Sequence, residues 1–207
     1  MNILRFPLGQ LQANCYIVIH DTNCIIIDPA DEASFILEEI QRRNLTLVGM
    51  IATHGHFDHV MAAGEIQLSY PSLPLYIHQK DIFLIDRLGE TAKHFLGHDP
   101  VVLKPQKMQN LKSGKLAIDD FTFTVLETPG HTPGSCCLYF QKEKVVFTGD
   151  TVFKDNIGRY DFSYSDKSEL QKSVAKIFKL PDETTIYSGH GEETLVDDEK
   201  KNFIHYF

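Results

Sequence analysis

Thr53-His54-Gly55-His56-Phe57-Asp58-His59 stands directly after a continuous apolar run, which predicts a strand covered on both faces. A loop at the end of such a strand presents functional side chains on a rigid scaffold. His54 and His56 are two residues apart, so in an extended turn they point the same way. Asp58 and His59 begin the next helix and turn away from that pair. This stretch therefore predicts ligands for two neighbouring metal ions.

Three later loops, each after a predicted strand, carry one further polar side chain apiece: His131, Asp150 and His190. Glycines beside them let the backbone approach a small central object. Asp150 can bridge two ions through its two oxygens, while His131 and His190 complete the separate coordination spheres. Two ions about 3.5–4 Å apart lower the pKa of a shared water and supply hydroxide near neutral pH. Imidazole and carboxylate ligands suit zinc, iron or manganese alike, and of the three we expect two zinc ions.

The composition excludes several classes of protein. The chain has 207 residues, and 20 Lys and Arg against 28 Asp and Glu give a formal charge of −8, which argues against a nucleic-acid partner. No apolar run approaches the ~18 residues of a membrane span, and no secretory signal is visible at the start. No linker or repeat divides the sequence. We expect a soluble, cytoplasmic protein with one domain over residues 1–207.

Short β-rich runs alternate with amphipathic stretches in two similar halves. This order favours two sheets covered by outer helices over one doubly wound sheet. Residues 87–114 show no firm period and are expected to form a loop region with one short helix. The predicted strands are 14–19, 24–27, 47–52, 121–126, 137–140, 145–147 and 185–187, and the predicted helices are 31–43, 168–179 and 197–204.

The order of these ligands resembles the His-x-His-x-Asp-His signature of the metallo-β-lactamase superfamily and its later ligands. The resemblance covers essentially the whole chain. It implies a four-layer αβ/βα sandwich of two mixed β-sheets flanked by helices, with the metal site at one edge between the sheets. It also implies one metal on His54, His56 and His131, the other on Asp58, His59 and His190, and Asp150 between them.

Individual residues narrow the branch of the superfamily. Asp150 argues against the true β-lactamases, which lack a bridging carboxylate, and His56 argues against the di-iron oxygen and nitric oxide reductases, which carry an acid there. RNA-processing members need extra arms and basic surfaces. The glyoxalase II-like group, which cleaves glutathione thioesters, remains. The stretches 128–135 and Gly158-Arg159-Tyr160-Asp161-Phe162 are similar to motifs of that group.

Two features depart from full-length glyoxalase II. Only 16 residues follow Gly191, so we expect the short form, without a separate C-terminal glutathione-binding domain. Tyr160 replaces the usual small hydroxyl residue. The expected substrate is a small-molecule thioester such as S-lactoylglutathione, attacked by metal-bound hydroxide, with Asp58 as ligand and proton acceptor. Arg159 is a candidate for a substrate carboxylate or for an ion pair with Asp161. Lys154 and Tyr160 are weaker substrate candidates or surface residues.

Other functions stay open at this point. Persulfide dioxygenases carry similar motifs but use one iron and consume oxygen. A lactonase is a more distant alternative. A non-catalytic metal-binding module is the alternative from another class, although all seven ligand positions are filled. The oligomeric state is left open.

Overall fold

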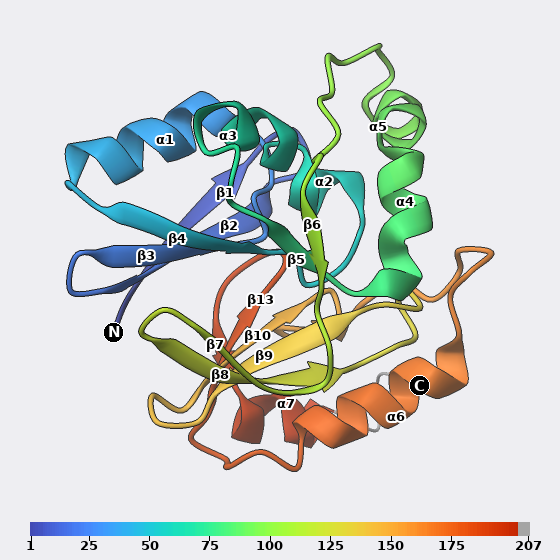
Figure 1. Cartoon of the computed structure of the whole chain (residues 1–207). Helices are drawn as coiled ribbons and strands as arrows, with labels where there is room; N and C mark the ends of the chain where they lie inside the picture. Colours follow the sequence, from blue (N-terminus) through green and yellow to red (C-terminus); the bar gives the residue numbers. More distant parts are fainter. Residues whose placement is uncertain (203–207) are drawn as a thin grey trace.

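Two six-stranded mixed β-sheets lie face to face, and helices cover their outer faces (Figure 1). This computed structural model describes residues 1–202. The arrangement is the four-layer αβ/βα sandwich that the sequence predicts.

The first sheet runs in the order β1-β2-β3-β4-β5-β6. Pairing is antiparallel from β1 to β3 and parallel from β3 to β6. Helices α1 (Ala33–Arg42) and α3 (Ala63–Ser69) lie over its outer face (Figure 1). The strands are β1 (Asn2–Leu8), β2 (Ala13–His20), β3 (Asn23–Ile27), β4 (Thr46–Ile51), β5 (Leu75–Ile77) and β6 (Met108–Asn110).

The second sheet runs in the order β14-β13-β10-β9-β8-β7. Only the β10–β13 pair is parallel among its described strands. Helices α6 (Lys167–Ile177) and α7 (Val196–Asn202) lie under this sheet (Figure 1). The strands are β7 (Gly114–Ile118), β8 (Phe121–Glu127), β9 (Cys136–Phe140), β10 (Val145–Gly149), β13 (Thr185–Ser188) and β14 (Thr194–Leu195).

Short elements complete the connections between the strands. Helix α2 follows the short loop after β4, and the β11–β12 ribbon follows β10. Helices α4 and α5 stand beside the sandwich (Figure 1). The bounds are α2 (Phe57–Val60), η1 (Gln79–Asp81), α4 (Ile82–Asp86), α5 (Leu88–Leu96), β11 (Val152–Phe153) and β12 (Asn156–Ile157).

Continuous apolar strands fill the layers because successive side chains point to opposite faces. In β3, Ile25 and Ile27 pack between the two sheets, whereas Ile26 packs toward α1. Phe121 and Phe123 of β8 meet the first pair from the opposite sheet. All five side chains are buried. Burial on both faces of the central strands fixes the strand ends that carry the polar loops.

Most predicted elements are confirmed within a residue or two, including the β2–β3 and β9–β10 hairpins. The predicted helix 31–43 begins later, at Ala33, because Glu32 takes a left-handed backbone conformation with φ 58°. Residues 203 and 204 of the predicted last helix lie outside the described residues. No helix within residues 1–202 combines the length and apolar character that crossing a bilayer requires.

Seven strands are absent from the sequence prediction: β1, β5, β6, β7, β11, β12 and β14. Strand β1 is an edge strand, and Pro7 within it is tolerated for that reason. The region 87–114, expected as a loop with one short helix, holds α5 and also β6. Strand β6 has the sequence Met-Gln-Asn and no apolar alternation, so only its backbone pairing with β5 identifies it.

Candidate metal centre

A buried acid at the end of the neighbouring strand supports the loop after β4. Asp28 follows β3, which pairs in parallel with β4. Its carboxylate accepts hydrogen bonds from the Thr53 amide at 2.7 Å, the Thr53 hydroxyl at 2.8 Å and His59 Nδ1 at 3.0 Å. Since a carboxylate only accepts, His59 Nδ1 carries the proton and Nε2 faces the cluster. Asp28 is a functional residue that the sequence reasoning missed.

The structure brings all seven predicted ligand residues together in two groups. The histidine group is His54, His56 and His131, and the mixed group is Asp58, His59 and His190. Asp150 lies between them. Its Oδ2 is 3.5 Å from His131 Nε2, and its Oδ1 is 3.4 Å from His59 Nε2.

Within each group the ligand atoms converge. In the histidine group, His56 Nδ1 lies 3.1 Å from His54 Nε2 and 3.0 Å from His131 Nε2. In the mixed group, Asp58 Oδ2 lies 3.3 Å from His190 Nε2 and 3.7 Å from His59 Nε2. One atom from each member of a group lies within 4.8 Å of all the others, and Asp150 falls with the histidine group by that criterion. Each set is compact enough to surround one ion.

Further hydrogen bonds orient the histidine group. His131 Nδ1 donates to the carbonyl oxygen of Arg159 at 2.8 Å, which leaves Nε2 for the cluster. His56 Nε2 lies 2.8 Å from the Tyr164 hydroxyl, and these atoms hydrogen-bond, which leaves Nδ1 for the cluster. Partners of this kind fix the tautomer and ring orientation of metal-binding histidines. Tyr164 lies 26 residues from His190, the nearest clustered histidine along the chain, and no motif pointed to it.

A second buried acid joins two of the histidine loops. Asp81 accepts from the Gly55 amide at 2.9 Å, the Gly134 amide at 2.6 Å and the Thr132 hydroxyl at 2.6 Å. A Cβ on Gly134 would meet the Asp81 carboxylate at 2.6 Å, so glycine is required there. Burial raises the pKa of Asp81. The sequence reasoning missed Asp81, because its contacts come from two loops far apart in the chain.

Two buried polar atoms fit the coordination of a cation. His59 Nε2 and Asp150 Oδ1 are buried, and neither has a hydrogen-bond partner within residues 1–202. Leaving such atoms unsatisfied is costly unless a ligand completes them. Gly189 also approaches Asp150 so closely that a Cβ would lie 2.1 Å from Oδ1. A divalent cation coordinated by imidazole and carboxylate fits this donor set.

The two groups differ in protonation. Burial lowers the pKa of His54 well below its ordinary value and, with the neighbouring His131, lowers the pKa of His56 to about 3. Burial also acts to lower the pKa of His59, but Asp150, Asp58 and Asp28 outweigh it and raise this pKa to about 10. Burial acts to raise the pKa of Asp58, yet His59 and His190 outweigh it and hold that pKa below its ordinary value. In the mixed group, therefore, a proton on His59 offsets part of the negative charge of the surrounding carboxylates.

A cavity of about 370 Å³ opens beside the cluster. Arg159 lines this cavity but donates to Asp161 at 2.9 and 2.8 Å, the ion pair that the sequence offered as its alternative role. Lys154 pairs with Glu192 at 2.7 Å, and Tyr160 lies under the ammonium of Lys167. Within residues 1–202, Lys154 and Tyr160 are not part of the cavity wall. The other lining residues are Leu11, His56, Phe57, Asp58, Thr91, Phe95, His131, Asp150, Phe153, Phe162 and His190.

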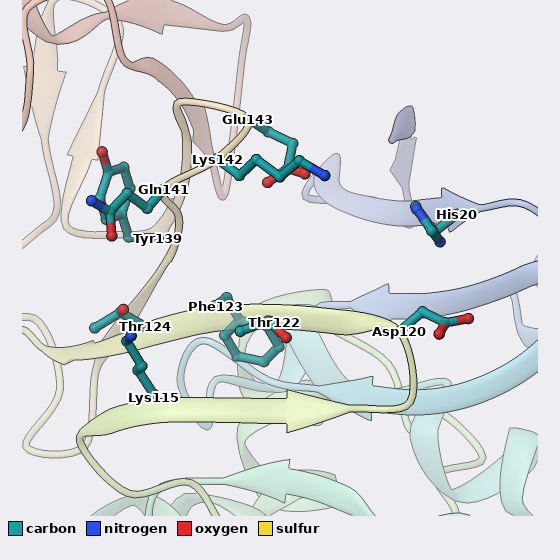
Figure 2. A pocket seen from close by; sticks show the side chains of 10 residues that line it. All are labelled: His20, Lys115, Asp120, Thr122, Phe123, Thr124, Tyr139, Gln141, Lys142 and Glu143. Carbon is teal, nitrogen blue, oxygen red and sulfur yellow. The ribbon is translucent and has the colours of Figure 1, made fainter.

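A larger cavity, of about 620 Å³, lies elsewhere (Figure 2). Strands β7 and β8 supply Lys115 and Thr124, and the β9–β10 turn supplies Gln141 and Glu143. Figure 2 shows these polar side chains spread widely around an open space. None of the seven clustered ligand residues lines it. The smaller cavity therefore holds the chemistry.

Comparisons with known proteins agree with this geometry. A family model described as the metallo-beta-lactamase superfamily matches residues 8–190. Hydroxyacylglutathione hydrolase GloC of Haemophilus influenzae is 36% identical, over 98% of this chain and 96% of that protein. Probable metallo-hydrolase YqgX of Bacillus subtilis is 34% identical, over 98% of this chain and 97% of that protein.

Two solved structures have a TM-score of 0.88 to this fold. BLEG-1 B3 metallo-beta-lactamase is 34% identical and covers 97% of both chains. TTHA1623 in a di-iron-bound form is 32% identical, over 96% of this chain and 98% of that one.

Proposed function

This chain belongs to the metallo-beta-lactamase superfamily, and we propose that it is a metal-dependent hydrolase of thioesters with two divalent ions at the cluster. The observation that carries the proposal is the sharing of Asp150 between two complete ligand groups, with Asp150 Oδ1 and His59 Nε2 left without partners within residues 1–202. The filled mixed group distinguishes this site from a module that has lost its ligands.

The ligand assignment follows from the atoms that face inward. His54 Nε2, His56 Nδ1 and His131 Nε2 would hold one ion, and the carboxylate of Asp58 with Nε2 of His59 and His190 would hold the other. Asp150 would contribute to both. Zinc is the metal that we propose first, with iron and manganese as alternatives. Of these two alternatives, iron is supported by the di-iron-bound form of TTHA1623. When bound, the ions polarise water and carbonyl groups and make hydroxide accessible near neutral pH.

The chain's own residues then direct the reaction. Asp58 is ionised near neutral pH because His59 and His190 hold its pKa low, and we assign it the proton of the attacking water, which bound ions would make more acidic. The water oxygen bonds to the thioester carbonyl carbon, and the carbon–sulfur bond breaks with its electron pair on sulfur. The thiolate takes up the proton, which gives one carboxylic acid and one thiol.

Similarity to GloC supports a thioester as the substrate and makes S-lactoylglutathione the first one to test. Arg159 is the candidate contact for a substrate carboxylate because it lines the cavity. Lys154 and Tyr160 remain weaker candidates for substrate contacts. The cytoplasm as the site of action is likewise a proposal.

A β-lactam is the second candidate substrate. It is favoured by BLEG-1, which is 34% identical over nearly the full length and is described as a B3 metallo-beta-lactamase. Nitrocefin hydrolysis, measured beside the thioester, distinguishes the two candidates. Oxygen uptake with glutathione persulfide, and one iron per chain, would instead favour a dioxygenase.

Metal analysis and a thioester assay on the purified protein test the proposal together. We expect two metal ions per chain and turnover of S-lactoylglutathione that falls about 100-fold or more in His56→Ala. His98→Ala, at an exposed histidine outside the cluster, is the matched control and keeps both metals and turnover. Absence of stoichiometric metal, or full turnover in His56→Ala, overturns the proposal.

A further inference from the structure

Apolar side chains from five separate segments converge on the cavity beside the cluster. They come from the β1–β2 turn, α2, α5, β11 and the loop after β12: Leu11, Phe57, Phe95, Phe153 and Phe162. Leu11 and Phe95 keep exposed fractions of 41% and 43%. Side chains that fill a core do not stay this exposed, and large apolar groups gathered at a cavity mark a binding surface.

The phenylalanines form an ordered aromatic wall. The Phe57 and Phe95 rings stack with centroids 5.8 Å apart, and Phe95 meets Phe162 edge-on at 6.5 Å. Phe162 in turn stacks on Tyr164 at 5.5 Å. Rings held in this way present faces and edges on which a further aromatic group packs favourably.

Apolar surface lies beside both ligand groups. Phe162 lies 5.2 Å from His56 and 5.9 Å from His131, on the side of the histidine group. Phe153 lies 6.1 Å from His190, on the side of the mixed group. A thioester carbonyl that reacts between the histidine group and the mixed group therefore has apolar protein surface near both its acyl group and its sulfur side.

The cations near the cavity do not favour an anionic substrate. Among the described residues that line the cavity, Arg159 is the one Lys or Arg, and it lies over the Phe162 ring at 4.6 Å. The nearby cations already have carboxylate partners, in the pairs Arg159–Asp161 at 2.8 Å, Lys154–Glu192 at 2.7 Å and Arg5–Glu193 at 3.6 Å. A substrate carboxylate at these cations would compete with the acids that already pair with them.

We infer that the preferred substrate is a thioester that is uncharged and apolar on both sides of the reacting carbonyl, with an aryl-sized acyl group against the phenylalanine wall. This inference rests on the proposed thioester hydrolysis and narrows its substrate class. The products are an aryl-bearing carboxylic acid and a neutral thiol.

Four substrates test the inference, as lactoyl or mandeloyl thioesters of glutathione or of N-acetylcysteamine. Mandeloyl differs from lactoyl by a phenyl ring in place of a methyl group. We expect mandeloyl to raise kcat/KM at least about 10-fold with either thiol. Replacing glutathione by N-acetylcysteamine should not lower kcat/KM. A preference for S-lactoylglutathione over the other three overturns the inference and leaves the proposed function standing.

Phe95→Ser tests the wall itself, because Phe95 is exposed enough for the protein to fold without it. We expect the ratio of mandeloyl to lactoyl turnover to fall several-fold toward one. Leu68→Ser removes an equally apolar side chain with a 72% exposed fraction on α3, outside the cavity wall, and should keep the wild-type ratio. An unchanged ratio in Phe95→Ser contradicts the inference.

A binding measurement keeps the two proposals distinguishable. The thioether ketone S-phenacyl-N-acetylcysteamine resembles the substrate but has no thioester bond to hydrolyse, and calorimetry can follow its binding to the metal-free protein. We expect binding at least about 10-fold tighter than that of the S-acetonyl analogue, and loss of this difference in Phe95→Ser. Equal binding of the two ketones contradicts the aromatic wall, whereas failure of all four thioesters to react contradicts the proposed function.

Discussion

The histidine group and the mixed group lie side by side but differ in the protonation of their histidines. Burial lowers the pKa of His54 and His56, so the histidine group holds neutral imidazoles before any metal arrives. In the mixed group, three carboxylates raise the pKa of His59 to about 10 although burial opposes them. A metal ion therefore enters the histidine group without displacing a proton from these two rings, but replaces a proton in the mixed group.

The largest effect is expected where the two groups meet. Asp150→Asn removes the carboxylate that faces His131 on one side and His59 on the other. We expect metal content to fall from two ions to one or fewer, and kcat/KM for the thioester to fall about 1000-fold. Mass spectrometry of bound metal and a steady-state assay measure both. Asp155→Asn, at an exposed aspartate in the β11–β12 turn, should change neither; two ions retained in Asp150→Asn would contradict the shared role.

The contrast in protonation predicts different pH dependence of metal affinity. Between pH 6.5 and pH 9 the mixed group must release the His59 proton, so its affinity should rise about tenfold per pH unit. Over the same range, affinity at the histidine group should change much less, since His54 and His56 are already neutral. Competition with a chelator at several pH values resolves the two steps. Parallel pH dependence of both steps would remove the distinction between the groups.

Asp28→Asn tests whether Asp28, at the end of β3, supports the mixed group and not the histidine group. The amide replaces a carboxylate that accepts from His59 Nδ1 and from Thr53. We expect affinity for the second ion to fall about 10- to 100-fold, with little change at the histidine group. Metal titration of the variant gives both values. Equal loss at the two groups would show that Asp28 supports the loop as a whole.

The stability of the metal-free protein should reflect both groups. His56 has a folded pKa of about 3 against 6.5 unfolded, so its contribution is lost as pH falls from 6.5 toward 3. His59 has a folded pKa of about 10, so its contribution is present below 6.5 and lost as pH rises toward 10. We expect a maximum in the unfolding free energy near pH 6.5, with slopes on the order of 1 kcal/mol per pH unit. Urea unfolding with chelator present measures this, and a steady rise through pH 9 would contradict the His59 assignment.

The smallest effect is expected away from the cavity. Lys154 forms an exposed ion pair with Glu192 and is not a lining residue, so Lys154→Ala should change kcat/KM less than about twofold. Steady-state kinetics at low salt check this. A larger loss would support Lys154 as a substrate contact, the weaker of the two roles considered from the sequence.

The sequence predicted the side chains that stand just after a single strand. It did not predict the residues whose role depends on contacts with distant parts of the chain. The seven clustered side chains were found because each follows an apolar run within a few residues. Asp28, Asp81 and Tyr164 were not found, because each acts on a loop that is distant in the chain. Strands β1 and β6 were missed for a related reason. They are edge strands, and backbone pairing rather than an apolar pattern defines them.

By itself, the sequence determined which chemical groups are available and that two covered sheets would present them at strand ends. The tertiary structure decided how those groups share charge, since the pKa of His59 depends on Asp58 of its own helix α2 and on Asp28 and Asp150, which follow the separate strands β3 and β10. It also decided that Arg159 pairs with Asp161 and that phenylalanines from three segments form one wall. The physical reason is that residue type and periodicity are local properties, whereas burial and electrostatic interaction depend on distances that only the folded chain sets.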